Sequence, residues 1–91
     1  MAQTTVLVWA MLHPGHHPDE VFVIAGPDHS AFVDVTQVRP AKPVLAGQDR
    51  RGQVMAFVIE QGQWESLVEL PGVAVGALRG WVRNERIKPL S

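Results

Sequence analysis

Residues 62–90 read GQWESLVELPGVAVGALRGWVRNERIKPL, and they carry the strongest structural pattern in the chain. A Gly-x-Trp triplet opens this stretch, and residues 64–70 then alternate between apolar and polar side chains. Such alternation is typical of a β-strand with one buried face. Residues 71–76 contain Pro-Gly and predict a loop, after which residues 77–82 predict another strand. A short polar step and a last apolar segment complete a small all-β unit.

The N-terminal half predicts the same order of features. Residues 6–12 and residues 54–59 are continuous apolar runs, which predict strands covered on both faces. Residues 20–24 and 30–33 predict two further strands, separated by a Pro-Asp turn. The matching segments are Val8-Trp9-Ala10 with Val54-Met55-Ala56, Glu20–Ile24 with Glu65–Leu70, Phe32-Val33 with Trp81-Val82, and Val38-Arg39-Pro40 with Ile87-Lys88-Pro89. Val33 to Pro40 and Val82 to Pro89 have the same spacing, so we interpret the halves as an internal repeat.

The repeat predicts how the chain is organised. We expect residues 1–91 to form one compact unit, with subrepeats 5–40 and 53–90 joined by a linker at 41–52. A unit of about 40 residues is near the lower limit for folding alone, so the copies should share a core or pack about a pseudo-twofold axis. The alternative is that two short β-meanders resemble each other by coincidence.

Gly62-x-Trp64, Gly80-Trp81-Val82 and Ile87-x-Pro89 together resemble the bacterial Src-homology-3 family of small barrels. The resemblance implies an all-β fold of two tandem Src-homology-3-like small barrels or half-barrels packed with pseudo-twofold symmetry; the alternative is a single barrel with an N-terminal extension. In the eukaryotic branch of that family, aromatic residues form a groove that binds proline-rich peptides. This chain has no tyrosine, and Arg86 takes the position of a groove tyrosine, whereas Asn84 stands near a common family asparagine.

Composition limits the classes of partner. Hydrophobic residues make up 46% of the chain and charged residues 19%, below the usual share of about 25%. A low charge content leaves two interpretations open, a buried homo-oligomer interface or a bland monomer surface. The net charge of −1 gives no overall attraction to nucleic acid. No cysteine, export signal or membrane-length apolar run is present, so we expect a cytoplasmic protein without disulfides.

Tryptophan and arginine gather in the C-terminal half. Trp81 follows a glycine at a strand end, and the family resemblance places that position beside the ligand groove. We therefore predict a binding surface formed by Trp81, Arg79, Arg83 and Arg86, with Trp64 and the 71–76 loop nearby. A protein partner is the first expectation, and nucleic acid, held by the same basic face, is the alternative. Trp9 lies in an apolar run and is expected in the core.

Histidines form the one other chemical cluster. His13, His16 and His17 lie close to Asp19 and Glu20, and His29 is on the facing turn. Imidazole and carboxylate suit Zn²⁺ or Ni²⁺, but no recognised ligand spacing is present, so we expect a solvated loop and no metal site. The chain also lacks a nucleophile–base motif and a phosphate-binding glycine loop. We expect no enzyme activity and no cofactor.

Overall fold

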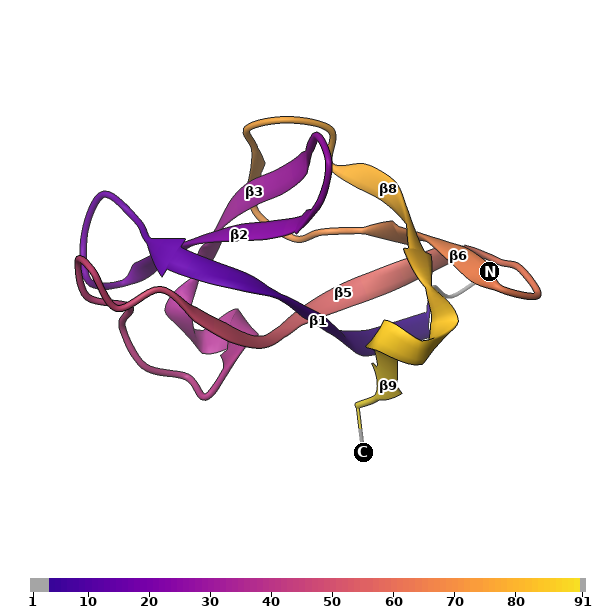
Figure 1. Cartoon of the computed structure of the whole chain (residues 1–91), viewed down its shortest axis with the longest axis horizontal. Helices are drawn as coiled ribbons and strands as arrows, with labels where there is room; N and C mark the ends of the chain where they lie inside the picture. Colours follow the sequence, from indigo (N-terminus) through magenta and orange to yellow (C-terminus); the bar gives the residue numbers. More distant parts are fainter. Residues whose placement is uncertain (1–3, 91) are drawn as a thin grey trace.

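The computed structural model describes residues 4–90. Within this range the chain forms strands and two short 3₁₀ helices (Figure 1). The elements of the first half are β1 (Thr4–Pro14), β2 (Glu20–Gly26), β3 (His29–Asp34), η1 (Val35–Gln37) and β4 (Val38–Arg39). Those of the second half are β5 (Arg50–Gln61), β6 (Glu65–Glu69), β7 (Val73–Ala74), β8 (Arg79–Arg83), η2 (Asn84–Arg86) and β9 (Ile87–Pro89).

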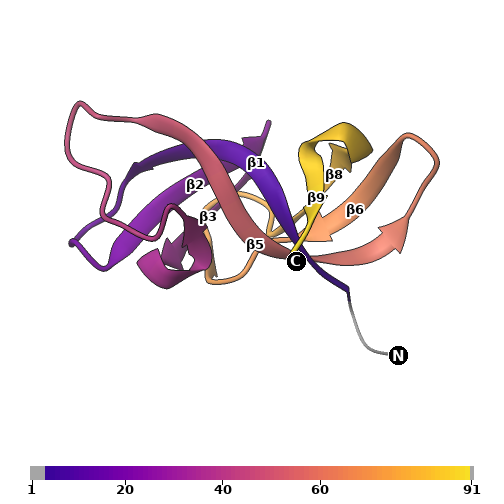
Figure 2. The same ribbon diagram turned by 90° about the horizontal axis from the view of Figure 1, so that it is seen from below.

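One curled antiparallel sheet contains every strand of residues 4–90. Its main path is β7-β3-β2-β1-β5-β6-β8, while β4 pairs with β5 and β9 pairs with β1. The long strands β1 and β5 lie side by side at the centre, with β2 and β3 toward one end and β6 and β8 toward the other (Figure 2). The prediction of an all-β fold is confirmed, and the curled sheet is consistent with a Src-homology-3-like small barrel. The described residues contain no helix that could span a membrane.

The central strand β1 buries one face fully and the other only in part. In β1 every second residue from Val6 to Leu12 is buried, whereas Leu7 and Trp9 are only half-buried. Trp9 instead packs against the guanidinium of Arg51, with 5.0 Å between that group and the ring centroid. The expectation that both faces are fully covered, with Trp9 in the core, is therefore wrong: on the second face of β1, Met11 is exposed and Trp9 is covered in part by the guanidinium of Arg51.

The strand registers of the two halves correspond residue for residue. The β2–β3 pairs are Glu20–Asp34, Val21–Val33, Phe22–Phe32, Val23–Ala31 and Ile24–Ser30. The β6–β8 pairs, in the same order, are Glu65–Arg83, Ser66–Val82, Leu67–Trp81, Val68–Gly80 and Glu69–Arg79. Each member of the first series thus has one equivalent in the second, and Phe32 is the equivalent of Trp81.

The short strands obey the same correspondence. Val38 of β4 pairs with Val54, and Ile87 of β9 pairs with Val8. Val8 and Val54 also pair with each other at the centre of the β1–β5 ladder. A rotation that exchanges the two halves would place the Val38–Val54 pair on the Ile87–Val8 pair and leave the Val8–Val54 pair in place. This is the arrangement expected of pseudo-twofold symmetry.

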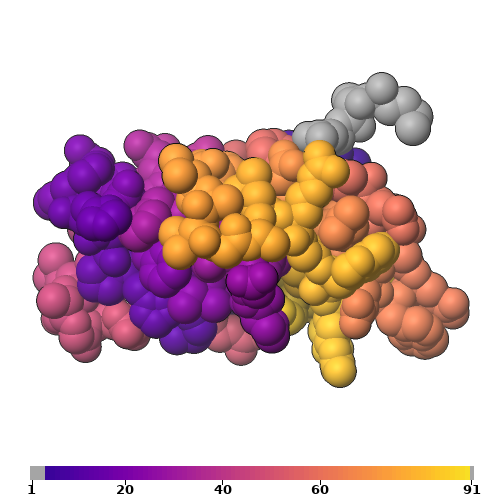
Figure 3. Space-filling view, turned by 90° about the horizontal axis from the view of Figure 1, so that it is seen from above, coloured from indigo at the N-terminus to yellow at the C-terminus, as the bar shows by residue number. Residues whose placement is uncertain are grey.

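The segment between β6 and β8 departs from this correspondence. The sequence predicts only a loop here, but Val73–Ala74 form β7, which pairs with β3 through Phe32–Val73 and Ala31–Ala74. Figure 3 shows these residues, in orange, lying against the purple and magenta first half. Gly72 permits the approach, because its φ is +87° and a Cβ there would collide with the carbonyl oxygen of Phe32.

A single cluster of buried apolar residues joins the halves. It contains valines from β1, β2, β3, β5, β6 and β8, together with Leu12 and Leu70. Val44, from the segment between β4 and β5, is also buried in this cluster. The described residues therefore share one core.

Candidate binding surface

Two tryptophans lie next to each other on the outer surface of the second half. Trp81 is on β8 and its side chain is 52% exposed, while Trp64, in the β5–β6 turn, is 76% exposed. Both line a shallow hollow together with Glu65. On the same face of the sheet, Leu67 of β6 pairs with Trp81. We call Trp64, Glu65, Leu67 and Trp81 the tryptophan face.

Asn84 fixes the turn that carries Trp64. Its Nδ2 donates to the carbonyl oxygens of Gly62 and Gln63, each at 3.0 Å, and its backbone N–H donates to the Trp64 oxygen at 2.9 Å. The Ser66 hydroxyl in turn donates to Asn84 Oδ1 at 2.7 Å. Asn84 thus takes part in three hydrogen bonds through its side chain and in one through its backbone. These bonds hold the turn in place without a ligand, which lowers the entropic cost of binding one.

Gly62 is required at the start of this turn. A Cβ at that position would collide with the carbonyl oxygen of Glu65 and would lie 3.8 Å from the Trp81 ring. Sequence reasoning identified Gly62 and Trp64 as a motif and Asn84 only through resemblance. The hydrogen bonds from Asn84 to the turn had no sequence signal, since the two segments lie about twenty residues apart.

The arginines around the tryptophan face have acidic neighbours. Arg79 Nε lies 2.7 Å from Glu69 Oε1, and Arg83 lies 3.7 Å from the exposed carboxylate of Glu85. Surface pairs of this kind contribute little stability, but they balance the local charge. The face is therefore aromatic at its centre and of mixed sign around it.

The structure does not bring Arg86 to the other four predicted residues. Its guanidinium donates to the carbonyl oxygens of Trp9 and Ala25, both at 2.7 Å. Burial, and then the nearby charge of Arg51, lower the pKa of Arg86. Arg86 thus connects β1 and β2 to the second half, in a separate hollow beside Trp9.

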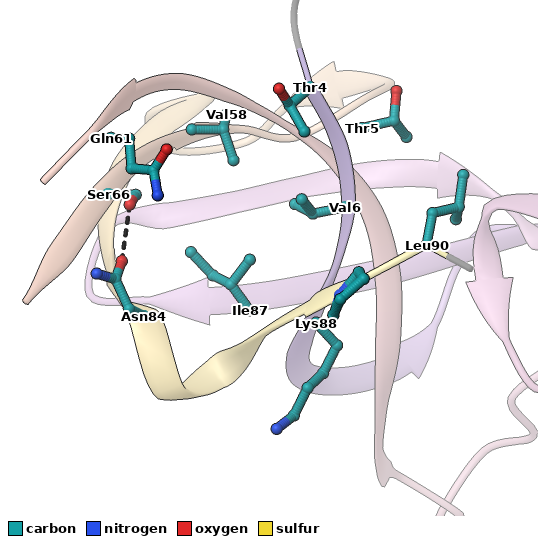
Figure 4. A pocket seen from close by; sticks show the side chains of 11 residues that line it. Thr4, Thr5, Val6, Val58, Gln61, Ser66, Asn84, Ile87, Lys88 and Leu90 are labelled. Atoms are coloured by element: carbon teal, nitrogen blue, oxygen red, sulfur yellow. Dashed lines mark hydrogen bonds between the residues drawn. The ribbon is translucent and has the colours of Figure 1, made fainter.

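A second concave site opens at the end of the second half (Figure 4). This pocket of about 520 Å³ is lined by Val6, Val58 and Ile87, with the hydrogen-bonded side chains of Ser66 and Asn84 on one wall. Figure 4 shows the Lys88 ammonium directed away from these apolar side chains. The pocket therefore combines apolar contact with polar side chains at its rim, from Thr4, Thr5 and Gln61.

The histidine loop is held by contacts between histidine and carboxylate side chains. His16 donates its backbone N–H to Glu20 Oε1 at 2.8 Å and its ring lies 2.9 Å from the same oxygen; the backbone bond, above all, lowers the pKa of Glu20. His13 lies 2.9 Å from Asp49. No group of three or more His, Asp or Glu side chains placed to hold a metal ion occurs within residues 4–90.

His29 lies apart from that loop, between the halves. It is 3% exposed, and its Nε2 lies 3.0 Å from the carbonyl oxygen of Leu78, a distance at which the ring N–H donates. Nδ1 is buried without a partner and packs against Gly80, where a Cβ would be 2.6 Å from it. Burial is the main cause that lowers the pKa of His29, and the charge of Arg86 adds to it, so the site favours the neutral ring.

Comparison with protein-family models finds no match to this chain, and neither do comparisons with curated proteins or with solved structures.

Proposed function

We propose that the chain is a non-enzymatic binding module that recognises a protein partner through the tryptophan face. The observation that carries this proposal is the adjacent exposure of Trp64 and Trp81, at 76% and 52%. Large apolar side chains exposed side by side are uncommon on monomeric proteins and mark interaction surfaces. Tryptophan is also the residue type most enriched among residues that dominate protein–protein affinity.

Rigidity around the face supports the same proposal. Trp81 stands on a strand paired with β6, and four hydrogen bonds involving Asn84 hold the Trp64 turn. A pre-organised surface loses little conformational freedom on binding, so more of the contact energy becomes affinity. Balanced charges around the tryptophans would orient a partner of mixed polarity.

Nucleic-acid binding is the less supported alternative. A phosphate backbone attracts cations that are not already neutralised. Arg79 and Arg83 have carboxylates beside them, and Arg86 is committed to backbone carbonyls in another hollow. The tryptophans alone could stack bases, but within residues 4–90 no unpaired group of cations is placed around them to hold the phosphates.

We also infer that the halves, residues 5–40 and 53–90, descend from a duplicated unit joined by residues 41–52. The equivalent registers of β2–β3 and β6–β8 support this origin. Duplication would let one copy maintain the fold while the other changed its outer face for binding.

Selection from a random peptide display library on the immobilised protein tests the proposed function. We expect enriched peptides whose affinity falls at least about tenfold in both Trp64→Ala and Trp81→Ala, the loss typical of a dominant contact residue. Leu45→Ala is the control, because Leu45 is 59% exposed on the segment between β4 and β5. Peptides that bind both tryptophan variants as tightly as wild type would contradict the proposal. Salt-sensitive binding of single-stranded DNA or RNA, with no peptide enriched, would favour the alternative.

A further inference from the structure

Strand β8 is the last strand on the path of the sheet, and within residues 4–90 it pairs with β6 alone. Two hydrogen bonds bracket its pairing with β6, from Leu70 N–H to the Leu78 oxygen (3.0 Å) and from Asn84 N–H to the Trp64 oxygen (2.9 Å). Hydrogen-bonded and non-bonded pairs alternate along an antiparallel ladder. Gly80 and Val82 therefore direct their backbone groups toward β6. The backbone groups of Arg79, Trp81 and Arg83 point outward.

No other strand within residues 4–90 pairs with that outer edge. The equivalent edge of β3 is occupied, because β7 pairs with it at Phe32 and the Ser30 oxygen accepts from Val75 N–H at 3.1 Å. The two turns explain the difference. Residues 70–78 are long enough to reach β3, whereas the tight turn between β2 and β3 is too short to supply a strand to β8.

A second copy of this chain is a poor occupant of the edge. Antiparallel pairing of two β8 strands about Trp81 would place Arg79 of each copy opposite Arg83 of the other. Like charges directly opposite each other destabilise a strand pair.

Strand β6 shows the kind of segment that β8 accepts. On the outer face Glu65, Leu67 and Glu69 lie opposite Arg83, Trp81 and Arg79, respectively. Arg79 and Arg83 already have one carboxylate each beside them, from Glu69 and Glu85. A guanidinium has five N–H donors, so each arginine can still donate to a second carboxylate on its open side. An extended segment with the pattern acidic-x-apolar-x-acidic would place one carboxylate beside each arginine, whereas a nucleic-acid backbone would bring a continuous row of negative charge against Glu65, Glu69 and Glu85. In the first half the corresponding row already has three apolar members, Phe22, Phe32 and Val73.

We propose that the outer edge of β8 accepts an extended segment of a partner protein as an added antiparallel strand. Its apolar residue lies beside Trp81, and its two acidic residues lie beside Arg79 and Arg83. This inference rests on the proposed function and specifies the partner for the same face. Backbone hydrogen bonds supply affinity, and alternate side chains supply specificity.

A blocked peptide, acetyl-Thr-Glu-Thr-Val-Thr-Glu-Thr-amide, is the probe for this edge. Binding is followed by chemical shift changes at the amides of β8 during titration. In the proposed register the peptide valine forms the hydrogen-bonded pair with Trp81, so N-methylation of that valine should weaken binding at least about tenfold. N-methylation of the next threonine is the matched control, because its N–H points away from β8 and binding should persist. A peptide with lysine in place of both glutamates should bind more weakly than the parent.

Arg83→Pro tests the protein side of the same contact. Arg83 has φ −59°, close to the value of about −65° that proline imposes, and its N–H points away from β6. Proline is tolerated on an edge strand in that position, so the variant should fold while losing one outward donor. Arg83→Ala is the matched control for the lost charge, and we expect about tenfold weaker peptide binding in Arg83→Pro than in Arg83→Ala.

The outcomes separate this inference from the proposed function. Equal binding of the parent and valine-methylated peptides, or of the two Arg83 variants, would overturn strand addition. It would leave the function intact if library peptides still depend on Trp64 and Trp81. Failure of the acidic probe while other library peptides bind would overturn the proposed occupant. A dimer that forms with rising concentration and protects the β8 amides would assign the edge to a second copy and also overturn it.

Discussion

Phe32 and Trp81 occupy equivalent positions in the two halves, yet their surroundings differ. The Phe32 ring lies 5.0 Å from Phe22 and 4.5 Å from His16, measured between centroids, and β7 pairs alongside it. Trp81 is half-exposed beside an open strand edge. The same strand order thus supports a covered outer face in one half and an accessible one in the other.

The ends of the two halves show the same contrast. Leu12 and Val58 are equivalent, as each faces a buried valine of the neighbouring strand, Val23 or Val68. Leu12 is fully buried and Val44, from the segment between β4 and β5, is buried as well, whereas Val58 lines the open pocket. One end is filled by aliphatic side chains. The other end is wider and carries a polar pair.

Alanine substitutions at these equivalent positions should give the largest difference. Leu12→Ala should lower the free energy of unfolding by about 3 kcal/mol, since it empties a fully buried site that packs on Gly52. Val58→Ala should cost about 1 kcal/mol, because part of that side chain already faces the pocket. Urea denaturation of both variants measures the difference. Equal losses would show that the two ends are packed alike.

Removing the equivalent aromatic residues should give the next largest effect. Phe32→Ala should destabilise by about 2 kcal/mol, because the ring packs against Phe22 and His16. Trp81→Ala should cost less than about 1 kcal/mol, since half of its surface is already in water. Thermal or urea unfolding compares them directly. A greater loss in Trp81→Ala would mean that Trp81 serves the fold rather than binding.

Asn84→Ala should cost about 1–2 kcal/mol and loosen the Trp64 turn, because the carbonyl oxygens of Gly62 and Gln63 lose a donor. The equivalent residue, Val35, makes no such side-chain bonds, so Val35→Ala controls for general loosening of a 3₁₀ helix. Backbone amide shifts should change at residues 62–66 only in the Asn84 variant. Unchanged shifts there would show that the turn holds its shape without Asn84.

Mild acid should produce a smaller effect through His29. Its folded-state pKa lies below the ordinary value of 6.5, so the unfolded chain binds the proton more readily. The stability linked to this group is fully present above about pH 6.5 and is lost as the pH falls toward the folded-state pKa. The urea midpoint should therefore drop between pH 7.5 and 5.5 in wild type and less in His29→Gln. The same drop in both proteins would assign the titration to other groups.

Sequence periodicity predicted most of the sheet and part of the site. The apolar runs gave β1 and β5, because strand alternation and β-branched residues are local properties. Val73–Ala74 were missed as a strand, since two exposed residues have no periodicity and form β7 only by pairing with distant Phe32. Arg86 was grouped with Trp81 by proximity along the chain, but η2 turns it toward the carbonyl oxygens of Trp9 and Ala25. Pairing between distant segments decides both cases, and a single sequence carries little signal for it.

Amide hydrogen exchange in the free monomer tests the difference between the two strand edges most directly. The register with β7 makes Phe32 a hydrogen-bonded partner of Val73, whereas the Trp81 N–H points away from β6. We expect slow exchange at the Phe32 amide and rapid exchange at the Trp81 and Arg83 amides. The amides of Gly80 and Val82, which face β6, should exchange slowly. Protection of the Trp81 amide equal to that of Phe32 would show that the β8 edge is already occupied, and would contradict its role as a binding edge.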